Sequence, residues 1–250
     1  ELIENTALGA VAAADLDSAS FATARDLTYG IDFGFVIEEP RDLLEVVGDL
    51  AFQGGLWVNH FDLFTCIALK NAISAADSVA TITKTGAVTD YIQGTLVIEQ
   101  QDLDDVTTEV RVSRVDKDGK ESVRSSAAET ARGGPKVIDL DLWAINKQDM
   151  RIDVARFWAK RWSNLHEYVT FDVGLALTKL LPNDVITLTV TDSHSQVLYA
   201  SKPFRITHVT DHMDAGRITV RAERILFDYA VEEVDVDGYY YYLKAKMQGA

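Results

Sequence analysis

Two histidines in the C-terminal third of the chain have the spacing of a helical zinc site. His208 and His212 are four residues apart, and Asp211 and Asp214 lie beside them. On a helix this spacing puts two imidazoles on one face, where both can bind zinc. The surrounding sequence, FRITHVTDHMDAGRITV, instead alternates like a β-hairpin and places the two imidazoles around a turn. We therefore interpret the pair as part of a solvated turn and predict no metal site.

Three further motifs lack residues that their chemistry would need. The segment DKDGKES begins like a calcium-binding loop, but the third acidic position before its glycine and the distal glutamate are missing. Residues 193–195 are Ser, His and Ser, yet neighbours on an extended segment point in opposite directions. The pairs Gly54-Gly55 and Gly133-Gly134 lack the spacing and the lysine of a phosphate-binding loop. We predict a chain that is not an enzyme and that uses no cofactor.

Paired carboxylates occur at three places: Glu38-Glu39, Asp104-Asp105 and Glu232-Glu233. Two carboxylates that face each other across a cleft can hydrolyse a glycosidic bond. Such pairs are common in an acidic chain, and the sequence singles out none of them. An acid–base hydrolase remains an alternative without assigned residues.

Four aromatic residues could together form a platform for sugar rings: Phe157, Trp158, Trp162 and Tyr168. The first three recur at helical spacing in line with Met150 and Val154, which is typical of a helix face that packs on a core. The spacing favours a structural role for the cluster over a binding platform.

The balance of charge limits the partners that the chain can have. Lys and Arg number 24 against 39 Asp and Glu, which gives a net charge of −15. Nucleic acids and anionic membranes attract basic surfaces, so we expect neither to bind, although DNA could slide past an acidic surface. The longest apolar runs are too short and too charged to span a membrane. Cys66 is the single cysteine, and its apolar surroundings predict a buried, inert thiol.

The sequence predicts an α+β fold that is mainly β. Residues 1–26 predict a weakly ordered lead-in that could hold a short helix. Residues 27–95 predict an α+β module with a strand (TYGIDFGFVI), a helix (EEPRDLLEVVGDLAFQGG) and a hairpin (LWVNHFDLFTCIAL). In that helix Pro40 suits the first turn, and Gly54 and Gly55 follow its end.

The second half predicts a small antiparallel β-barrel module over residues 96–235, with a packed helix at 149–165. Short alternating strands are separated by turn signals, and the segment AAETARGGP is predicted to be a loop. QVLYASK and PFRITHVT are predicted as two strands. Residues 236–250 contain four consecutive tyrosines and predict an aromatic extension that packs on another domain or chain.

Five residues are expected to hold this module together. Pro182, Asn183 and Asp184 form the turn before the strand DVITLTV, because proline and residues that tolerate a left-handed backbone favour such turns. Trp158 and Trp162 pack the helix onto the barrel.

The order of these elements resembles the hub or tail-tip proteins of long-tailed bacteriophages and gene-transfer particles. A loop with two glycines leads into KVIDLDLWAI, the helix VARFWAKRW, the strand EYVTFDVGLALTKL and the segment LPNDVITLTV, and FRITHVT and GRITVRAERI follow. YGIDFGFVIEEPRDLLEVVGDLAFQGGLWV is similar to the first module of that family. The turn of the family has Gly where this chain has Asn183, a residue that also tolerates a left-handed backbone. The resemblance covers residues 27 to 230.

The resemblance implies a non-enzymatic structural component of a phage tail tip or baseplate hub in the virion. Three copies would form a homotrimeric ring at the distal end of the tail tube, through which DNA passes. The implied partners are tail-tube, distal-tail, tape-measure and fibre proteins, with DNA only as transiting cargo and no direct membrane binding. The alternative is a carbohydrate-binding or adhesion module that displays its aromatic side chains.

Overall fold

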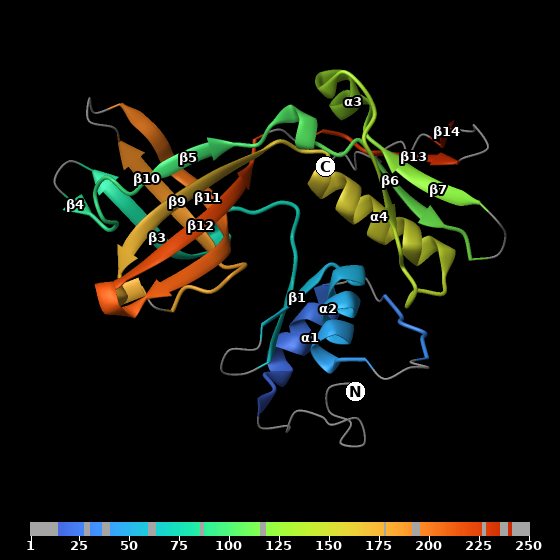
Figure 1. Cartoon of the computed structure of the whole chain (residues 1–250), viewed down its shortest axis with the longest axis horizontal. Coiled ribbons are helices and arrows are strands. Elements are labelled where there is room, and N and C mark those ends of the chain that lie inside the picture. Colours follow the sequence, from blue (N-terminus) through green and yellow to red (C-terminus); the bar gives the residue numbers. More distant parts are fainter. Residues whose placement is uncertain are drawn as a thin grey trace, which may run out of the picture.

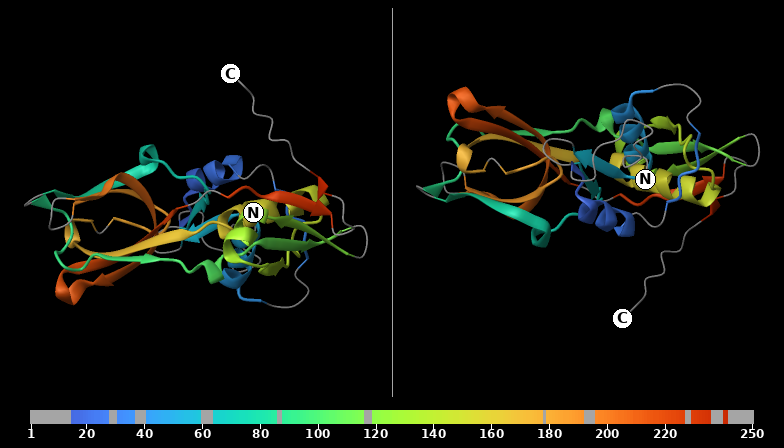
Figure 2. Two further views of the ribbon diagram at one scale, coloured as in Figure 1. Left: turned by 90° about the horizontal axis from the view of Figure 1, so that it is seen from above. Right: turned by 90° about the horizontal axis from the view of Figure 1, so that it is seen from below.

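In the computed structural model two β-sheets lie at opposite ends of the molecule, with two helices and a hairpin beside their junction (Figures 1 and 2). The structure describes residues 15–27, 31–36, 41–59, 64–85, 88–115, 119–177, 179–191, 196–226, 229–235 and 240–241. Within these ranges no helix is long and apolar enough to cross a membrane. The architecture confirms the predicted α+β fold that is mainly β.

The larger sheet has seven strands in the order β4-β3-β10-β11-β12-β9-β5. They are β3 (Ser78–Thr85), β4 (Val88–Thr89), β5 (Val97–Gln100), β9 (His166–Gly174), β10 (Val185–Thr191), β11 (Val197–His212) and β12 (Arg217–Ile225). Neighbouring strands pair antiparallel except β3 and β10, which pair parallel, so the sheet is mixed. Tyr91, just after β4, bridges Val173 of β9, the strand next to β5, and so brings the two ends of the strand order close together.

Alternate residues of the long strands form the interior of this sheet. Val169, Phe171 and Val173 on β9, and Ile218 and Val220 on β12, are almost completely buried in one apolar cluster. Successive side chains of a strand point to opposite faces, so alternating apolar residues line one face of the sheet. This period of two is the pattern from which the sequence predicted the strands.

The smaller sheet has five strands in the order β14-β13-β7-β6-β8. They are β6 (Glu109–Ser113), β7 (Lys120–Arg124), β8 (Val137–Leu140), β13 (Glu232–Asp235) and β14 (Tyr240–Tyr241). Helix α4 (Gln148–Trp162) packs on β6 and β7 through a stripe that includes Val154, Ala155 and Trp158. The strands predicted as one module thus form two sheets with separate apolar clusters.

The predicted lead-in contains one helix, as its sequence allowed, and the first predicted module contains a second helix and a hairpin. Helix α1 (Ser18–Leu27) packs on β2 (Thr65–Ala68), and α2 (Leu43–Gln53) packs on β1 (Leu56–Asn59). β1 and β2 pair antiparallel as predicted, while residues 60–63 of the connection lie outside the described ranges. Cys66 is buried in β2, and burial raises the pKa of its thiol to about 11, so the thiol stays protonated at neutral pH.

Two expectations for this module differ from the structure. Helix α2 begins at Leu43 because the Asp42 side chain accepts hydrogen bonds from the amides of Leu44 and Glu45, whereas Pro40 lies outside the described residues. The strand predicted over 28–37 is wrong for residues 31–36, which are extended but belong to no sheet. Their side chains do alternate between half-buried and exposed, so the two-residue alternation of a strand is present although no strand pairs with this segment.

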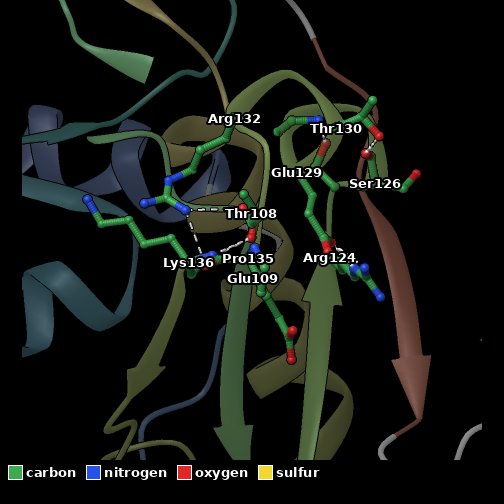
Figure 3. A network of polar contacts seen from close by, with 12 residues as sticks. Thr108, Glu109, Arg124, Ser126, Glu129, Thr130, Arg132, Pro135 and Lys136 are labelled. Carbon is green, nitrogen blue, oxygen red and sulfur yellow. Dashed lines mark hydrogen bonds and ion pairs between the residues drawn. The ribbon is translucent and has the colours of Figure 1, made fainter. Parts of the chain in front are cut away.

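The segment AAETARGGP was predicted to be a loop, but it contains helix α3 (Ser126–Arg132). Ser125 caps its first turn, and Gly133 ends it in the left-handed region at φ 83°. The Glu129 side chain pairs with Arg124 of β7, and Arg132 donates to the carbonyl of Pro135 at 3.3 Å (Figure 3). These local contacts explain why a short helix of low apolar content is stable here.

The two strands predicted over 196–210 form a single long strand, β11. The backbone continues through Pro203, which lies opposite Thr187 of β10, and Ser201 takes a positive φ of 50° within the strand. His208 and His212 both lie on this strand, so the prediction that they flank a turn is wrong. Strand β3 of the first predicted module pairs with β10 of the second. The division into separate domains stays a prediction, and of residues 236–250 the structure describes only β14.

Replacing Gly55 by Ala should destabilise the protein by about 1–2 kcal/mol. Gly55 has a φ of +62°, and an added Cβ would lie 3.3 Å from the Phe157 ring. Urea denaturation of Gly55→Ala measures the loss. Gly134→Ala is the matched control, because Gly134 has open space around it and no positive φ, and it should change stability by about 0.5 kcal/mol or less. Equal effects of the two substitutions would contradict the prediction.

Candidate functional site at an aromatic cleft

A stack of aromatic rings joins α2 to α4. The ring centroids of Phe52 and Trp158 are 4.6 Å apart with 20° between the planes, and those of Trp158 and Trp162 are 4.8 Å apart at 25°. The indole nitrogen of Trp158 donates to the carbonyl of Phe52 at 3.2 Å. The residue is 6% exposed, so its rings cannot stack on a ligand. Both tryptophans pack with α2 and the five-stranded sheet, not with the seven-stranded sheet.

Beside this stack lies a cavity of about 630 Å³, called the aromatic cleft below. It lies between α2, β1, α4 and the strands β11 and β12, and its lining includes Leu44, Phe52, Trp57, Trp158, Arg161 and Arg205. Trp57 is 41% exposed, in contrast to Trp158. The cleft is therefore lined by one accessible indole ring and by charged side chains.

The predicted turn at 182–184 borders the same cleft through Asn183. Asn183 adopts φ 72°, in the left-handed region, and follows Pro182 as the third residue of a turn that begins at Leu181. Its amide donates to the carbonyl of Ile206 at 2.7 Å, which ties the turn to β11. Burial raises the pKa of Asp184, although the Leu181 amide, 2.8 Å from its carboxylate, stabilises the charged form.

Arg161, Arg205 and Glu223 line the cleft, and His166 lies against Glu223; these four side chains are called the charge cluster. Arg161 of α4 forms an ion pair with Glu223 of β12. The Nδ1 atom of His166 lies 3.5 Å from the second carboxylate oxygen of Glu223. A guanidinium nitrogen of Arg205 donates to the carbonyl of Lys70, just after β2.

The cluster keeps Glu223 ionised. Burial opposes its negative charge, but His166, Arg161 and Arg205 outweigh that cost and hold the pKa of Glu223 at about 2. Burial lowers the pKa of Arg205 to about 10, which leaves it charged at neutral pH. A carboxylate that is ionised and paired in this way is not poised to donate a proton, so the cluster does not have the features of a general acid.

The sequence identified part of this site. Trp158, Gly55 and Asn183 were singled out, and the structure places them around the aromatic cleft or against Phe157 at its side. Glu223 and Arg205 were missed. The signal that could have found them is Arg161, a charged residue in the apolar stripe of α4, which needs a buried counter-charge.

The candidate metal ligands are not brought together. His208 lies on β11 and lines the aromatic cleft, whereas His212 lies at the far end of the strand. In the part of the chain that the structure describes, no group of three or more His, Cys, Asp or Glu residues could hold a metal ion. The sequence motif at residues 193–195 lies outside that part.

Comparison with solved structures shows the fold of this chain in a tail protein from Neisseria meningitidis MC58. The two share 15% sequence identity with a TM-score of 0.51, over 77% of this chain and 58% of the other. A 43 kDa tail protein of prophage MuSo2 from Shewanella oneidensis is similar at 12% identity and a TM-score of 0.45, over 76% of this chain and 56% of the other. A chain from the virion of a native gene transfer agent particle is similar at 16% identity and a TM-score of 0.45, over 71% and 38%.

This chain therefore spans less than two thirds of the length of each of the three proteins. No protein-family model and no curated protein matches the sequence. At identities this low the likeness establishes a shared fold.

Replacing Trp158 by Ala should destabilise the protein by about 3–5 kcal/mol, because the change leaves a cavity in the core and removes the tie to Phe52. Denaturant unfolding followed by circular dichroism measures the loss. Trp57→Ala is the matched control and should cost about 1 kcal/mol or less, because Trp57 is half-exposed. A cost below about 1 kcal/mol for Trp158→Ala would show that its ring is not part of the core.

Replacing Glu223 by Gln should cost about 3–5 kcal/mol at pH 7, because Arg161 loses its ion-pair partner and the buried Arg205 loses the nearby negative charge. The pKa of Glu223 is lower in the folded chain than in the unfolded chain. Its ionised form therefore stabilises the fold above the ordinary pKa of a glutamate, and this contribution, on the order of 3 kcal/mol, is lost as the pH falls towards 2.

The difference in the free energy of unfolding between wild type and Glu223→Gln should accordingly shrink as the pH falls from 5 to 2. Denaturant unfolding at a series of pH values measures it. Glu99→Gln removes a carboxylate of an exposed pair with Arg221 and should change stability by about 0.5 kcal/mol or less. A difference that stays constant over this range would show that Glu223 does not titrate as described.

Proposed function

We propose that this chain is a structural component of a phage tail or a related particle, and more narrowly of a tail tip or baseplate hub in the virion. In this role it forms a homotrimeric ring at the distal end of the tail tube, through which DNA passes. It acts by shape and assembly, without catalysis. The observation that carries the proposal is the fold shared with the tail protein from Neisseria meningitidis over 77% of this chain.

The charge of the chain supports a role beside moving DNA. A net charge of −15 disfavours retention of DNA, because tight binding to DNA requires many cationic side chains that displace counterions. A wall of this charge lets DNA pass without adsorbing it.

An exposed sheet edge supports self-association. β5 is an edge strand of the seven-stranded sheet and pairs with β9 on one side. Its Val97 and Ile98 are 50% and 43% exposed, so the edge combines free backbone groups with apolar side chains. Monomeric proteins normally protect such edges with charges or short strands, and β5 is short and carries Glu99. Its two exposed apolar side chains nevertheless offer a surface for another chain. In a ring this edge contacts the neighbouring copy.

The remaining partners follow from the position of the ring. Tail-tube and distal-tail proteins lie above it, the tape-measure protein ends at it, and fibre proteins extend from it. No direct contact with a membrane is required of this chain.

A second candidate is carbohydrate binding or adhesion, which one observation favours. Trp57 is 41% exposed and lines the aromatic cleft, and exposed indoles stack on sugar rings. Because Trp158 is buried, the aromatic cluster on α4 cannot form the sugar-binding surface. Trp57 is then the main residue that could stack on a sugar ring.

Light scattering of the purified chain over a concentration series should give a trimer of about 83 kDa, three chains of 27.7 kDa, because closed symmetry satisfies identical interfaces. Val97→Lys should shift the population to monomers by charging the β5 edge. Val36→Lys is the control, since Val36 is exposed and lies outside both sheets.

Two results would contradict the proposal in its narrow form. One is a monomer at every concentration, and the other is a trimer that Val97→Lys and Val36→Lys weaken equally. In the first case loss of glycan binding on replacing Trp57 by Ala would instead establish the carbohydrate-binding alternative.

A further inference from the structure

A second cavity, of about 330 Å³, adjoins the charge cluster and is called the basic cavity below. Residues 71–73, the C-terminal end of α4 and the strands β11 and β12 line it. It shares Arg161, Arg205 and Glu223 with the aromatic cleft. Its volume is at the lower end of the range in which proteins hold small molecules.

The basic cavity concentrates positive charge in an acidic chain. Its lining holds four Lys or Arg side chains and one carboxylate, that of Glu223: Lys160, Arg161, Arg205 and Arg224. Arg161 is paired with Glu223, and Arg224 with Glu167 outside the cavity. Arg205 forms no ion pair with any carboxylate of the described residues, although it is only 4% exposed. The nearby charge of Glu223 offsets only part of the cost of burying Arg205, whose pKa stays lowered, so the cavity favours a further negative group.

Two buried polar atoms of the lining residues have no hydrogen-bond partner within the described ranges. They are one guanidinium nitrogen of Arg205 (Nη1) and the side-chain oxygen of Asn71 (Oδ1). The amide nitrogen of Asn71 donates to the carbonyl of Phe157 at 3.0 Å, which fixes the oxygen as the unpaired atom. Buried polar groups are almost always paired, so a donor and an acceptor left open at one cavity point to a polar partner that binds there.

We propose that the basic cavity binds a small oxyanion that also carries a hydroxyl group, of the phosphate or hydroxycarboxylate class. Its anionic oxygen accepts a hydrogen bond from Nη1 of Arg205, and its hydroxyl donates to Oδ1 of Asn71. The guanidinium groups of Arg161 and Arg205 supply the charge that makes the site selective for anions. The ligand thereby satisfies the open hydrogen-bonding groups at the junction where α4, the segment after β2 and two strands meet.

The burial of Arg205 agrees with this assignment. Desolvation lowers the pKa of its guanidinium to about 10, which reflects the cost of holding a charge away from water. A bound anion offsets that cost, because charge-assisted hydrogen bonds are among the stronger polar contacts in proteins. This ligand site does not depend on the proposed tail function, and it would exist equally in a monomer.

Equilibrium dialysis of the full chain against radiolabelled inorganic phosphate and, separately, glycolate tests the proposal. We expect saturable binding of one equivalent per chain of at least one of the two, and the tighter of them assigns the class. Sulfate and acetate carry a negative charge but no hydroxyl donor at neutral pH, so they should compete about tenfold less well.

Two variants locate the site. Arg205→Gln should weaken binding by about tenfold or more. Because that change can also perturb folding, Ala72→Glu provides a second route. Ala72 is an exposed lining residue, and a carboxylate there repels anions without disturbing the core. Ala72→Gln is the matched neutral control and should bind as wild type does.

Three results would overturn the proposal or part of it. Without saturable binding of either probe the cavity holds water alone. Binding that Ala72→Glu leaves unchanged belongs to another part of the surface. Equal competition by sulfate and phosphate would overturn the requirement for a hydroxyl and the role of Asn71.

Discussion

The ion pair between Arg161 of α4 and Glu223 of β12 connects the two separate apolar cores of this protein. α4 packs on the five-stranded sheet (Figure 1), but near its C-terminal end Arg161 contacts Glu223 of the seven-stranded sheet. A buried ion pair adds little net stability compared with apolar residues, yet removing one partner is costly. Such a contact therefore affects the relative orientation of the two packed units more than the stability of either unit.

Other contacts at the junction depend on that orientation. Arg205 donates to the carbonyl of Lys70, Asn71 donates to the carbonyl of Phe157, and Trp158 donates to the carbonyl of Phe52. Each is a side chain that satisfies a backbone group of another element, so small changes in the angle between elements would break all three. The aromatic cleft and the basic cavity lie on this set of contacts, which makes their walls as rigid as the junction itself.

Local sequence patterns predicted where helices and strands form better than they predicted which of these elements pair or pack together. The alternation over β9 to β12 and the three- to four-residue period of α4 survive in the structure because each reflects one face packed on a core. The same alternation over residues 31–36 was misleading, since a strand needs hydrogen-bonded neighbours that no local pattern encodes. Helix α3 was missed because its stability comes from the Ser125 cap, the left-handed Gly133 and the contact of Glu129 with Arg124. The charge cluster joins residues up to 62 positions apart, and only Arg161 was conspicuous in the sequence.

The distribution of charge indicates what the junction contributes. Carboxylates outnumber basic residues by 39 to 24 in the whole chain, but the ratio is reversed around the basic cavity. If stability were the only requirement, apolar residues of similar volume would fill this space at lower cost. Cations in this place make the orientation of the two sheets depend on a negative group, first Glu223 and then the proposed oxyanion. In the proposed ring, a junction defined by directional polar contacts suits a part that must close with its copies.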